Sequence, residues 1–487
     1  MSNRPETNKQ SCPVYKKCGG CQLQNLSYPE QLEFKQKKVE KLLKRFCTVE
    51  KIIGMKTPYH YRNKVQAAFY TDKKGKIISG VYQSGSHHVV GIDSCQTEDV
   101  IADKIIVAVR KLLPSFRMTT YNEDTGKGFL RHILVKRGFA TNQIMLVLVT
   151  GTPVFPSKNN FVKAILKQFP EITTIVQNIN PYRTNLVLGD NQKVLYGKGY
   201  IEDILCGCRF RISPKSFYQI NPVQTEVLYG KAIEFANLKG NETVLDTYCG
   251  IGTIGIIAAK NGAGNVIGAE LNGDAVRDAI VNARANNLKN IRFYKADAGE
   301  FMREAADEDE KPDVVFMDPP RAGSDRKFLD SLIKMSPKKV VYVSCNPETL
   351  ARDLAYLTQN SPYKAQRIQP VDMFPHTAHI ETVVLLSQLK QKPDDYINVT
   401  IELDDMDITS AETKATYDEI KKYVFEHNAG MKVSNLYISQ VKRKCGIEVG
   451  KNYNLSKNED SRQPQCPEDK ERAIVEALEH FKMIQQE

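Results

Sequence analysis

The sequence predicts an α/β protein in which an open, mostly parallel sheet covered by helices follows a β-rich domain. From about residue 205, short apolar strands alternate with helical segments, which is typical of a doubly wound sheet. Between Tyr59 and Tyr200, β-branched and aromatic runs are broken by Gly, Asn and Asp, which indicates a β-rich domain. A polar stretch from Gln388 to Asp395 predicts a linker to a small, mainly helical extension. We therefore expect three parts: 1–204, 205–388 and 389–487.

Six apolar segments are the predicted strands of the second domain, and each alternates with a helical segment. They lie at Glu242–Asp246, Asn265–Glu270, Ile291–Lys295, Val314–Asp318, Lys339–Ser344 and Thr382–Leu386. In the β-rich domain, Ile77–Tyr82 and His132–Lys136 are predicted strands.

A helix is predicted near the N-terminus, over Ser27–Phe46. Pro29 falls in its first turn, and apolar residues recur on one face at helical spacing: Leu32, Val39, Leu42, Leu43 and Phe46. This helix could dock on the second domain.

The extension contains two short predicted helices, Thr416–Glu426 and Ser434–Lys444, around Asn428-Ala429-Gly430, and a third at Glu471–Ile484. The second helix ends in a basic run, so a helix-turn-helix-like unit is one interpretation. Residues 391–487 hold 14 Lys and Arg against 19 Asp and Glu, a net charge of −5 that argues against a strong nucleic-acid binder. We expect a small accessory domain.

The positive charge is concentrated in the first part of the chain. Residues 1–200 hold 31 Lys and Arg against 14 Asp and Glu, a net charge of +17, whereas residues 201–390 hold 23 against 24. Such a surplus predicts a polyanionic partner, most often nucleic acid. The alternative is a basic surface that serves only solubility.

The composition of the 487 residues, with 41% hydrophobic and 26% charged residues, is that of a folded protein. Apolar runs such as Met145–Val149 are far shorter than the roughly 20 residues that cross a bilayer. The first residues contain no apolar signal-peptide core. We expect a cytoplasmic protein with no membrane partner.

A cluster of cysteines predicts a metal site. Cys12, Cys18 and Cys21 fall within ten residues, and the two glycines before Cys21 let the backbone turn tightly around a metal centre. Three ligands need a fourth, and Cys95 is the best candidate. Four thiolates suit zinc or an iron–sulfur cluster. Because Cys95 has no paired cysteine nearby, the pattern favours iron–sulfur over zinc or unligated thiols.

A Gly-rich turn lies between the first predicted strand and helix of the second domain. Leu245–Gly255 contains the pattern G-x-G-x-x-G, and Glu270 ends the next strand about 20 residues on. The glycines let a cofactor approach the backbone, and the carboxylate can accept hydrogen bonds from two ribose hydroxyls. This motif predicts an adenosine-containing cofactor, NAD included; a tight turn with an ion-paired Glu is the alternative.

Two further motifs end later strands at the same predicted edge. Met317–Gly323 reads Met-Asp-Pro-Pro-Arg-Ala-Gly, and its double proline holds an extended loop where ligands of such sheets bind. Val343–Pro347 reads Val-Ser-Cys-Asn-Pro, so Cys345 leaves a strand beside the cofactor site. It is a candidate nucleophile, and a small buried filler is the competing interpretation.

Four motifs together resemble a known family. They are Asp318–Gly323, Ser344–Pro347, His379-Ile380-Glu381-Thr382-Val383 and Phe217-Tyr218-Gln219-Ile220-Asn221, and they resemble the S-adenosylmethionine-dependent RNA uridine-C5 methyltransferases. The cysteine set resembles that of the iron–sulfur-bearing 23S ribosomal RNA branch. The resemblance covers about residues 12–388. A β-barrel RNA-binding module that often precedes the cysteines is not expected before Cys12, and the last hundred residues are additional.

The resemblance implies a Rossmann-like class I methyltransferase domain at 205–388 and a basic RNA-binding domain with an iron–sulfur site at 1–204. Cys345 would add to uracil C6, and Glu381 would remove the C5 proton. Asp318 would hold the uracil edge or the methionine end of the cofactor, and Phe217 could stack on the flipped-out base. The implied cofactor-binding residues are Gln219, Tyr248, Glu270, Asp297 and Asp318. The implied cluster, of the 4Fe–4S type, is held by Cys12, Cys18, Cys21 and Cys95. Because the reaction transfers no electron, we expect the cluster to be structural, with redox sensing as the alternative role.

The expected partner is RNA, with 23S ribosomal RNA as the leading substrate and transfer RNA as the alternative. Phosphate contacts are expected from basic residues of the first domain, named here as Arg62, Lys64, Arg131 and Lys136, with Arg62 as the substrate-site candidate. An NAD-dependent iron–sulfur redox protein would leave Asp318 and Cys345 without a purpose. A non-catalytic RNA-binding protein is disfavoured because Cys345 and Glu381 are both present. No obligate protein partner is evident.

Overall fold

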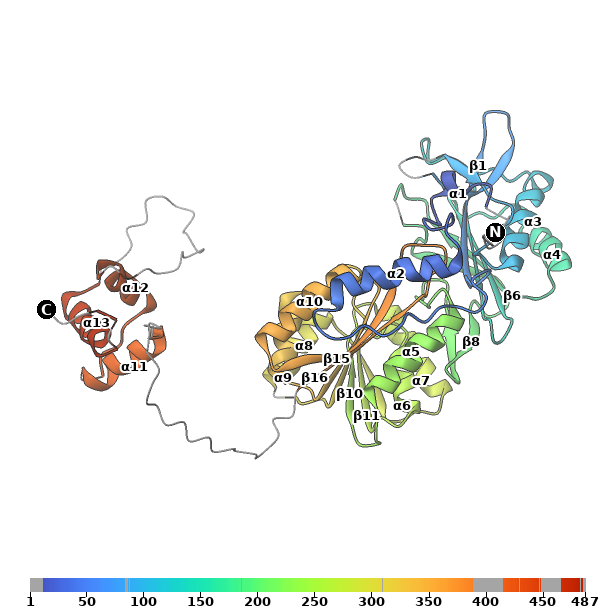
Figure 1. The fold of residues 1–487 in the computed structure, drawn as a ribbon. Helices are drawn as coiled ribbons and strands as arrows, with labels where there is room; N and C mark the ends of the chain where they lie inside the picture. Colours follow the sequence, from blue (N-terminus) through green and yellow to red (C-terminus); the bar gives the residue numbers. More distant parts are fainter. Residues whose placement is uncertain are drawn as a thin grey trace, which may run out of the picture. The chain divides into compact units, whose positions relative to one another are not determined.

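A computed structural model of the chain describes residues 12–388 apart from 84, 85, 87, 185 and 309, and then 415–445 without 429, 447, 466–481, 483 and 484. The chain divides into two compact units, Met1–Gln391 and Lys392–Glu487 (Figure 1). The linker predicted at Gln388–Asp395 lies, beyond Gln388, outside the described residues. The boundary predicted between residues 204 and 205 stays a prediction.

A seven-stranded sheet forms the second half of the first unit, in the order β12-β11-β10-β13-β14-β16-β15. All six predicted strands are confirmed, to within a few residues at their ends. The observed bounds are β10 (Thr243–Asp246), β11 (Asn265–Glu270), β12 (Ile291–Lys295), β13 (Val314–Met317), β14 (Lys339–Ser344), β15 (Tyr363–Val371) and β16 (Glu381–Gln388).

The sheet is parallel from β12 to β14 and antiparallel at its other edge. β16 runs antiparallel to β14 and to β15, which the sequence did not predict as a strand. The strand order reverses direction between β10 and β13, and ligands of open α/β sheets bind at the carboxyl ends beside such a point.

Helices cover both faces of this sheet because its strands present apolar residues alternately to each side (Figure 1). Val314 and Phe316 of β13 face one core, and Val315 and Met317 face the other. The first core takes residues of α5 (Pro222–Ala236), α6 (Thr253–Lys260) and α7 (Gly273–Ala285). The second takes residues of α2 (Tyr28–Leu43), α8 (Ala298–Asp307), α9 (Arg326–Met335) and α10 (Pro347–Asn360).

A second seven-stranded sheet, in the order β3-β2-β1-β4-β5-β6-β7, forms the N-terminal half of the unit. Its strands are β1 (Lys64–Thr71), β2 (Ile77–Tyr82), β3 (Val89–Gly91), β4 (Leu130–Arg137), β5 (Ile144–Thr150), β6 (Ile172–Ile179) and β7 (Asn191–Tyr196). The hairpin β8 (Ile201–Leu205) and β9 (Cys208–Ile212) follows, and two helices pack on the sheet, α3 (Val100–Leu112) and α4 (Lys158–Gln168). The short helix α1 covers Tyr15–Cys18, and a 3-10 turn covers Pro114–Phe116.

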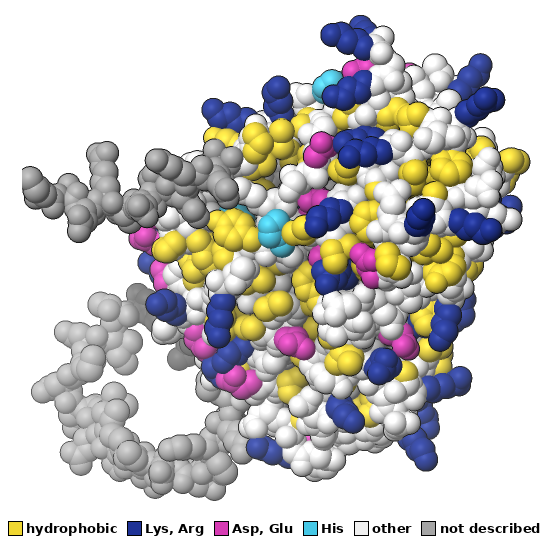
Figure 2. Space-filling model, turned by 90° about the vertical axis from the view of Figure 1, so that its right-hand side faces the viewer, with side chains coloured by type: hydrophobic (Ala, Val, Ile, Leu, Met, Phe, Trp, Pro, Cys, Tyr) yellow, Lys and Arg dark blue, Asp and Glu magenta, His cyan; other side chains and the backbone are white. Residues whose placement is uncertain are grey.

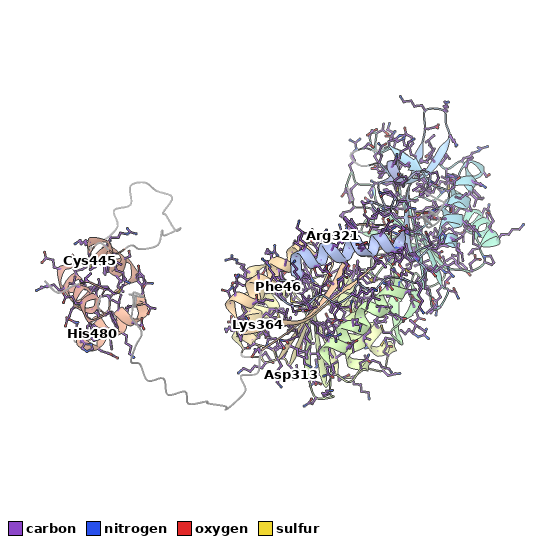
Figure 3. The ribbon with its side chains drawn as sticks, viewed as in Figure 1. Phe46, Asp313, Arg321, Lys364, Cys445 and His480 are labelled. Atoms are coloured by element: carbon purple, nitrogen blue, oxygen red, sulfur yellow. The ribbon has the colours of Figure 1, made fainter. Side chains whose placement is uncertain are left out.

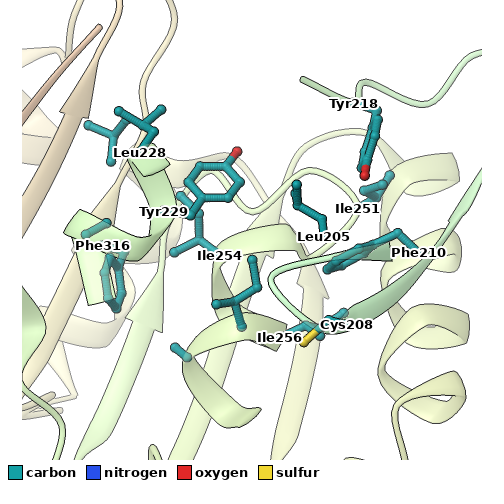
Figure 4. Packing of buried hydrophobic residues seen from close by; sticks show 14 of the residues in the cluster. Leu205, Cys208, Phe210, Tyr218, Leu228, Tyr229, Ile251, Ile254, Ile256 and Phe316 are labelled. Carbon is teal, nitrogen blue, oxygen red and sulfur yellow. The ribbon is translucent and has the colours of Figure 1, made fainter. Parts of the chain in front are cut away.

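One apolar core is shared by the two sheets. Every residue of β5 is buried, and its side chains alternate between two cores. Leu146 and Leu148 face α3 and α4, whereas Met145, Val147 and Val149 belong to the cluster that also holds the hairpin and the face of the β10–β16 sheet under α5. Figure 4 shows part of this cluster, including residues of the hairpin, α5 and α6. The two halves of the unit are therefore packed by common apolar contacts.

The helix predicted over Ser27–Phe46 is confirmed as α2, and its start is set by a capping box. The Ser27 backbone N–H and hydroxyl both donate to the Glu30 carboxylate at 2.7 Å. On its buried face, Lys35 donates to the Asp372 carboxylate at 2.6 Å, and neither side chain is exposed. The Tyr28 hydroxyl donates to the other Asp372 oxygen at 2.9 Å. These contacts hold α2 against the segment that follows β15.

The C-terminal unit contains α11 (Tyr417–His427), α12 (Asn435–Lys444) and α13 (Glu468–His480) around one apolar cluster. The three predicted helices are confirmed. In the basic run of α12, Lys442 is buried, donates to the Ala415 carbonyl and lies over the Tyr417 ring, and Lys444 pairs with Glu471. Among the described residues of the whole chain, no helix is long and apolar enough to cross a membrane.

Asp246 ends β10 as a buried carboxyl at the Gly-rich turn. Its Oδ2 accepts the Gly255 backbone N–H at 2.8 Å, whereas its Oδ1 makes no hydrogen bond. Burial raises the pKa of Asp246 to about 7, and the nearby Asp318 and Glu270 carboxylates add to this effect. The carboxyl therefore ionises in the folded protein only near neutral pH.

We expect Lys35→Met to lower the free energy of unfolding by about 3–5 kcal/mol, because it leaves the Asp372 charge buried without its partner. The matched control is Lys37→Met on the same helix. Lys37 pairs with Glu33, and the two side chains are 71% and 63% exposed. This substitution should lower the free energy of unfolding by about 0.5 kcal/mol or less. Urea unfolding of the full chain measures both values. Equal effects of the two substitutions would show that the buried ion pair of Lys35 with Asp372 contributes no more to stability than the exposed pair.

We expect Asp246 to make the unfolding free energy fall as pH rises from about 4 to 7. In this window the folded state holds a proton that the unfolded chain has released, so raising the pH favours unfolding. Asp246→Asn removes this contribution and keeps an oxygen for the Gly255 N–H. Relative to that of the unmutated protein, the free energy of unfolding of Asp246→Asn should rise by roughly 1 kcal/mol per pH unit between pH 5 and 7.

The control for the pH experiment is Asp93→Asn. Asp93 pairs with Arg110, which lowers the pKa of Asp93 below its usual value. Its contribution to stability is lost only at acid pH, so the effect of this substitution should stay constant between pH 5 and 7. A constant difference for Asp246→Asn as well would show that Asp246 is ionised throughout.

Candidate active site

The antiparallel register at β14 and β16 brings Cys345 and Glu381 together. Ser344, the last residue of β14, lies opposite Thr382. Cys345 follows the last residue of β14, and Glu381 is the first residue of β16. The two groups lie near each other at the carboxyl edge of the parallel strands, because the Glu381 carboxylate acts on the Cys345 thiol electrostatically. A pair of residues that are distant in the sequence thus meets because β16 returns antiparallel.

Cys345 is half-buried and lies among charged groups. Its pKa is raised to about 11 by burial and then by the Glu381 and Asp318 carboxylates, whereas the Arg321 guanidinium lowers it. A cavity of about 200 Å³ opens onto the thiol, and α2 forms part of its wall. Its lining includes Lys38, Arg321, Asn346, Ala378 and His379. Figure 3 marks Arg321 beside α2.

Glu381 and Asp318 form a pair of carboxyls beside the thiol. Glu381 is 4% exposed. Burial, followed by the Asp318 charge, raises the pKa of Glu381 well above its usual value, and Arg321 acts in the opposite direction. Burial raises the pKa of Asp318 to about 7. Burial thus favours the protonated form of both carboxyls, and a raised pKa is a property of carboxylates that act as general bases.

Tyr229 of α5 lies between the Glu381 and Asp318 carboxyls and the loop before α5, which contains Gln219. Burial is the main cause that raises the pKa of Tyr229, and the Asp318, Asp246 and Glu381 carboxylates add to it. The Gln219 side chain acts in the opposite direction and lowers this pKa. Figure 4 shows Tyr229 within the shared core. Gln219 is itself buried, and its carbonyl accepts from the Asn63 side chain at 3.0 Å.

The Gly-rich turn and Glu270 form the predicted cofactor edge. The two Glu270 oxygens accept the backbone N–H groups of Gly250, at 3.1 Å, and Asn272, at 2.7 Å. Gly250 has a φ of 54°, and a Cβ built on it meets nothing within 4 Å, so its backbone faces open space. Gly250, Glu270 and Phe217 line a cavity of about 460 Å³. An adenosine-containing group can approach this backbone closely.

The two other predicted cofactor residues lie at strand ends of the same sheet. Tyr248 is half-buried in the turn, with its hydroxyl 3.5 Å from the Ser324 hydroxyl. Asp297 follows β12 and is exposed. One of its oxygens caps α8 by accepting from the Gly299 and Glu300 backbone N–H groups.

The four predicted metal ligands lie in one neighbourhood. Burial raises the pKa of Cys21 to about 12, and the charges of Cys95, Cys18 and Cys12 contribute to that shift. A Cβ on Gly20 would lie 3.3 Å from the Cys18 sulfur, so a glycine suits this tight turn. Within the described residues, no group of three or more His, Cys, Asp or Glu side chains is arranged to hold a metal ion.

Two of the predicted phosphate contacts are wrong. Arg131 is 2% exposed and donates to the carbonyls of Asn180 and Tyr182 and to Glu123. Lys136 is 5% exposed and donates to two loop carbonyls before Phe217. Both cations satisfy backbone oxygens inside the protein, which sequence charge counts cannot detect.

Arg62 and Lys64 are half-buried, and Arg62 lies beside the cysteine segment. The Arg62 guanidinium opposes the rise in the pKa of Cys21 and, by repulsion, adds to the burial that lowers the pKa of Lys64. The Nε atom of Arg62 is buried and makes no hydrogen bond.

Sequence reasoning missed Tyr229, which has the spacing of an ordinary core residue and gives no local signal. It also assigned no role to Arg321, although that residue stands in the Asp-Pro-Pro-Arg motif. The motif position was the available signal, because an arginine beside a predicted nucleophile can favour a thiolate.

Comparisons with known proteins agree with this geometry. Residues 183–389 match the model of the tRNA (Uracil-5-)-methyltransferase family. An uncharacterized RNA methyltransferase of Bacillus cereus is 44% identical over 392 residues, which are 80% of this chain and 85% of that protein. An uncharacterized RNA methyltransferase of Listeria monocytogenes is 46% identical over 379 residues, 77% of this chain and 83% of that protein.

A solved structure is also similar. The Pyrococcus abyssi tRNA (uracil-54, C5)-methyltransferase in complex with S-adenosyl-L-homocysteine matches with a TM-score of 0.64 and 31% identity, over 75% of this chain and 85% of that chain. The cofactor class is therefore S-adenosylmethionine, and NAD is ruled out as the interpretation of the Gly-rich turn. This chain belongs to the family of S-adenosylmethionine-dependent RNA uracil-5-methyltransferases.

Proposed function

We propose that this enzyme methylates C5 of a specific uridine in 23S ribosomal RNA, with Cys345 as the nucleophile and Glu381 as the base. The observation that carries the proposal is the pairing of β14 with β16, which brings a thiol that opens onto a cavity near a buried carboxyl. A thiol for attack and a carboxylate for proton removal are the two groups that this reaction requires.

Uracil C5 is a poor nucleophile until a group adds to C6. The Cys345 sulfur forms a bond to C6, and the electron pair of the C5–C6 bond becomes available at C5. S-adenosylmethionine supplies the methyl group to that carbon. Glu381 then accepts the C5 proton, the C5–C6 double bond re-forms, and the sulfur leaves with its electron pair.

The electrostatics support this division of roles. The raised pKa of Glu381 makes it a stronger base than an exposed carboxylate. Asp318, with a pKa near 7, holds the uracil edge or the methionine end of the cofactor. Arg321 favours the thiolate of Cys345. Cys249 in the Gly-rich turn is a poorer candidate nucleophile, because it is buried and burial raises its pKa further.

The cofactor would lie along the edge formed by the Gly-rich turn, with Glu270 accepting from its ribose hydroxyls. The other proposed contacts are Gln219, Tyr248, Asp297 and Asp318. Phe217 is 65% exposed beside this edge and is proposed to stack on the flipped-out base. Arg62 is proposed as a phosphate contact.

The choice of RNA has two candidates. The cysteine set favours 23S ribosomal RNA, because it resembles the iron–sulfur-bearing enzymes of that branch. The Pyrococcus abyssi protein acts on tRNA, and the matching family model carries a tRNA description, so the same reaction on transfer RNA is the second candidate. We propose residues 1–204 as the RNA-binding domain, from their charge, and 389–487 as an accessory domain.

We also propose that Cys12, Cys18, Cys21 and Cys95 hold an iron–sulfur cluster of the 4Fe–4S type. Their thiols influence one another electrostatically, and four thiolates close together are costly without a metal. The cluster would be structural: the following segment is joined to the catalytic half through the Leu23 N–H, which donates to the His376 carbonyl at 2.9 Å.

We expect Glu381→Gln to accumulate as a covalent protein–RNA adduct. The amide cannot accept the C5 proton, so attack and methyl transfer occur but the sulfur cannot leave. A denaturing gel with radiolabelled transcripts of 23S ribosomal RNA and of transfer RNA measures the adduct, which should form with the ribosomal transcript. Substituting 5-fluorouridine at the target should trap the unmutated enzyme in the same way.

The adduct should vanish in Glu381→Gln combined with Cys345→Ala and persist in Glu381→Gln combined with Cys249→Ala. An adduct that survives loss of Cys345 would assign the nucleophile elsewhere. An adduct with transfer RNA alone would decide for the second substrate, and no adduct with either RNA would count against covalent catalysis.

We expect the protein purified without oxygen to be brown and to contain iron, measured by metal analysis. Cys18→Ser should lower yield and thermal stability more than it alters the activity of the protein that folds, because the cluster joins segments rather than reacting. Cys47→Ser, at a half-buried cysteine outside the predicted set, is the control and should retain iron. Stoichiometric zinc without iron would refute the proposed cluster.

A further inference from the structure

Two large apolar side chains stand exposed on the loop between β6 and β7. Tyr182 is 65% exposed and Leu186 is 72% exposed. Exposed aromatic and aliphatic side chains of this size, when they occur together on one loop, indicate an interaction site. No step proposed so far uses either residue.

The carbonyls of both exposed residues accept hydrogen bonds from buried polar groups. Arg131 donates to the Asn180 carbonyl at 2.7 Å and to the Tyr182 carbonyl at 2.8 Å. The Asn180 amide, which is 1% exposed, donates to the Leu186 carbonyl at 2.7 Å. Interior hydrogen bonds therefore fix the backbone on both sides of the loop while the two side chains point into solvent.

The end of the loop is fixed equally well. Asn178, which is fully buried, exchanges two hydrogen bonds with the Gly189 backbone, at 2.7 and 3.0 Å. A Cβ on Gly189 would lie 2.1 Å from the Ile179 carbonyl oxygen, so only glycine fits there. A loop held in this way presents its side chains without a large entropy loss on binding.

The loop adjoins the cofactor edge. Val187 and Leu188 pack against the core that includes Tyr218. Asp190 then pairs with Lys215 at 3.1 Å, two residues before Phe217. The end of the loop thus reaches the cavity of about 460 Å³, which Lys215 and Phe217 line.

The reaction requires such a surface. A uridine that is stacked in RNA must turn out of its stack to reach Cys345, and this leaves the neighbouring bases without a partner. Apolar and aromatic side chains on a rigid element can take the vacant position and contact the exposed base faces. Figure 2 shows one face of the molecule, on which patches of hydrophobic side chains lie among Lys and Arg side chains that suit the RNA backbone.

We propose that the β6–β7 loop is an RNA-binding element in which Tyr182 and Leu186 contact the bases next to the target uridine and hold the strand open. This proposal rests on the proposed methylation of a uridine at C5. Arg131, Asn178 and Asn180 are positioning residues that set the backbone of the loop. Tyr182 offers a ring for stacking, and Leu186 supplies an apolar wedge.

The test compares two RNAs that share one target sequence. In one RNA the target uridine is stacked within a stem-loop, and in the other it lies in an unstructured strand. Tyr182→Ala and Leu186→Ala should each lower kcat/KM for the stem-loop by about tenfold and change it less than about twofold for the unstructured strand. Only the stem-loop has a stack that must be held open.

The matched control is Tyr196→Ala. Tyr196 is an exposed tyrosine, 42% exposed, on the same β6–β7 hairpin, but it pairs with Ile175 at the opposite end from the loop. It should leave kcat/KM unchanged for both RNAs. Thermal unfolding of each variant, which should match the unmutated protein, separates loss of an RNA contact from loss of the fold.

Three results would overturn the proposal. Loop variants that keep full activity on the stem-loop would show that the exposed side chains do not contact RNA. Equal losses on both RNAs, with unchanged thermal unfolding, would assign the loop to general RNA binding rather than to opening the stack. Absence of C5 methylation of either RNA by the unmutated protein would overturn the proposed function and, with it, this inference.

Discussion

The ion pair between Lys35 and Asp372 is the constraint on which the arrangement of the active site depends. Both side chains are excluded from solvent, so each charge is tolerable only beside the other. Tyr28 occupies the second Asp372 oxygen, and Gln224 of α5 donates to the Asp372 carbonyl at 3.0 Å. A helix from the N-terminal part of the chain and a helix of the catalytic half therefore meet at one residue, nine positions before Glu381.

The segment between Asp372 and Glu381 is held along its length by distant parts of the chain. His376 contacts the Gln31 side chain and, through its carbonyl, accepts the Leu23 N–H. The Tyr61 hydroxyl donates to the Pro375 carbonyl at 2.9 Å. The segment that carries the predicted metal ligands is thus joined to the loop that leads to Glu381. A structural cluster is compatible with this arrangement, since it would strengthen the same connection without taking part in methyl transfer.

The N-terminal sheet and the catalytic sheet share one apolar core in the first unit. A shift of one sheet relative to the other would therefore break packed contacts. Arg131 and Lys136 are also used inside the protein. Their hydrogen bonds to carbonyl groups hold the loops that carry Tyr182, Leu186 and Phe217, so these two side chains are not available to bind phosphate. The basic surplus of the first 200 residues therefore overstates the cationic surface, because part of it satisfies carbonyl groups inside the protein.

The sequence by itself determined the strands β10–β14, the Gly-rich turn, α2 with its first-turn proline, and the motifs that contain Cys345 and Glu381, because these depend on local periodicity and turn chemistry. The tertiary structure alone decided that β15 is a strand and that β16 returns antiparallel, which brings the thiol near the carboxyl. It also decided the contact of Lys35 with Asp372, 337 residues away, and the place of Tyr229 beside the two carboxyls. Buried pairs of this kind follow from which surfaces pack together, and local sequence carries no record of that packing.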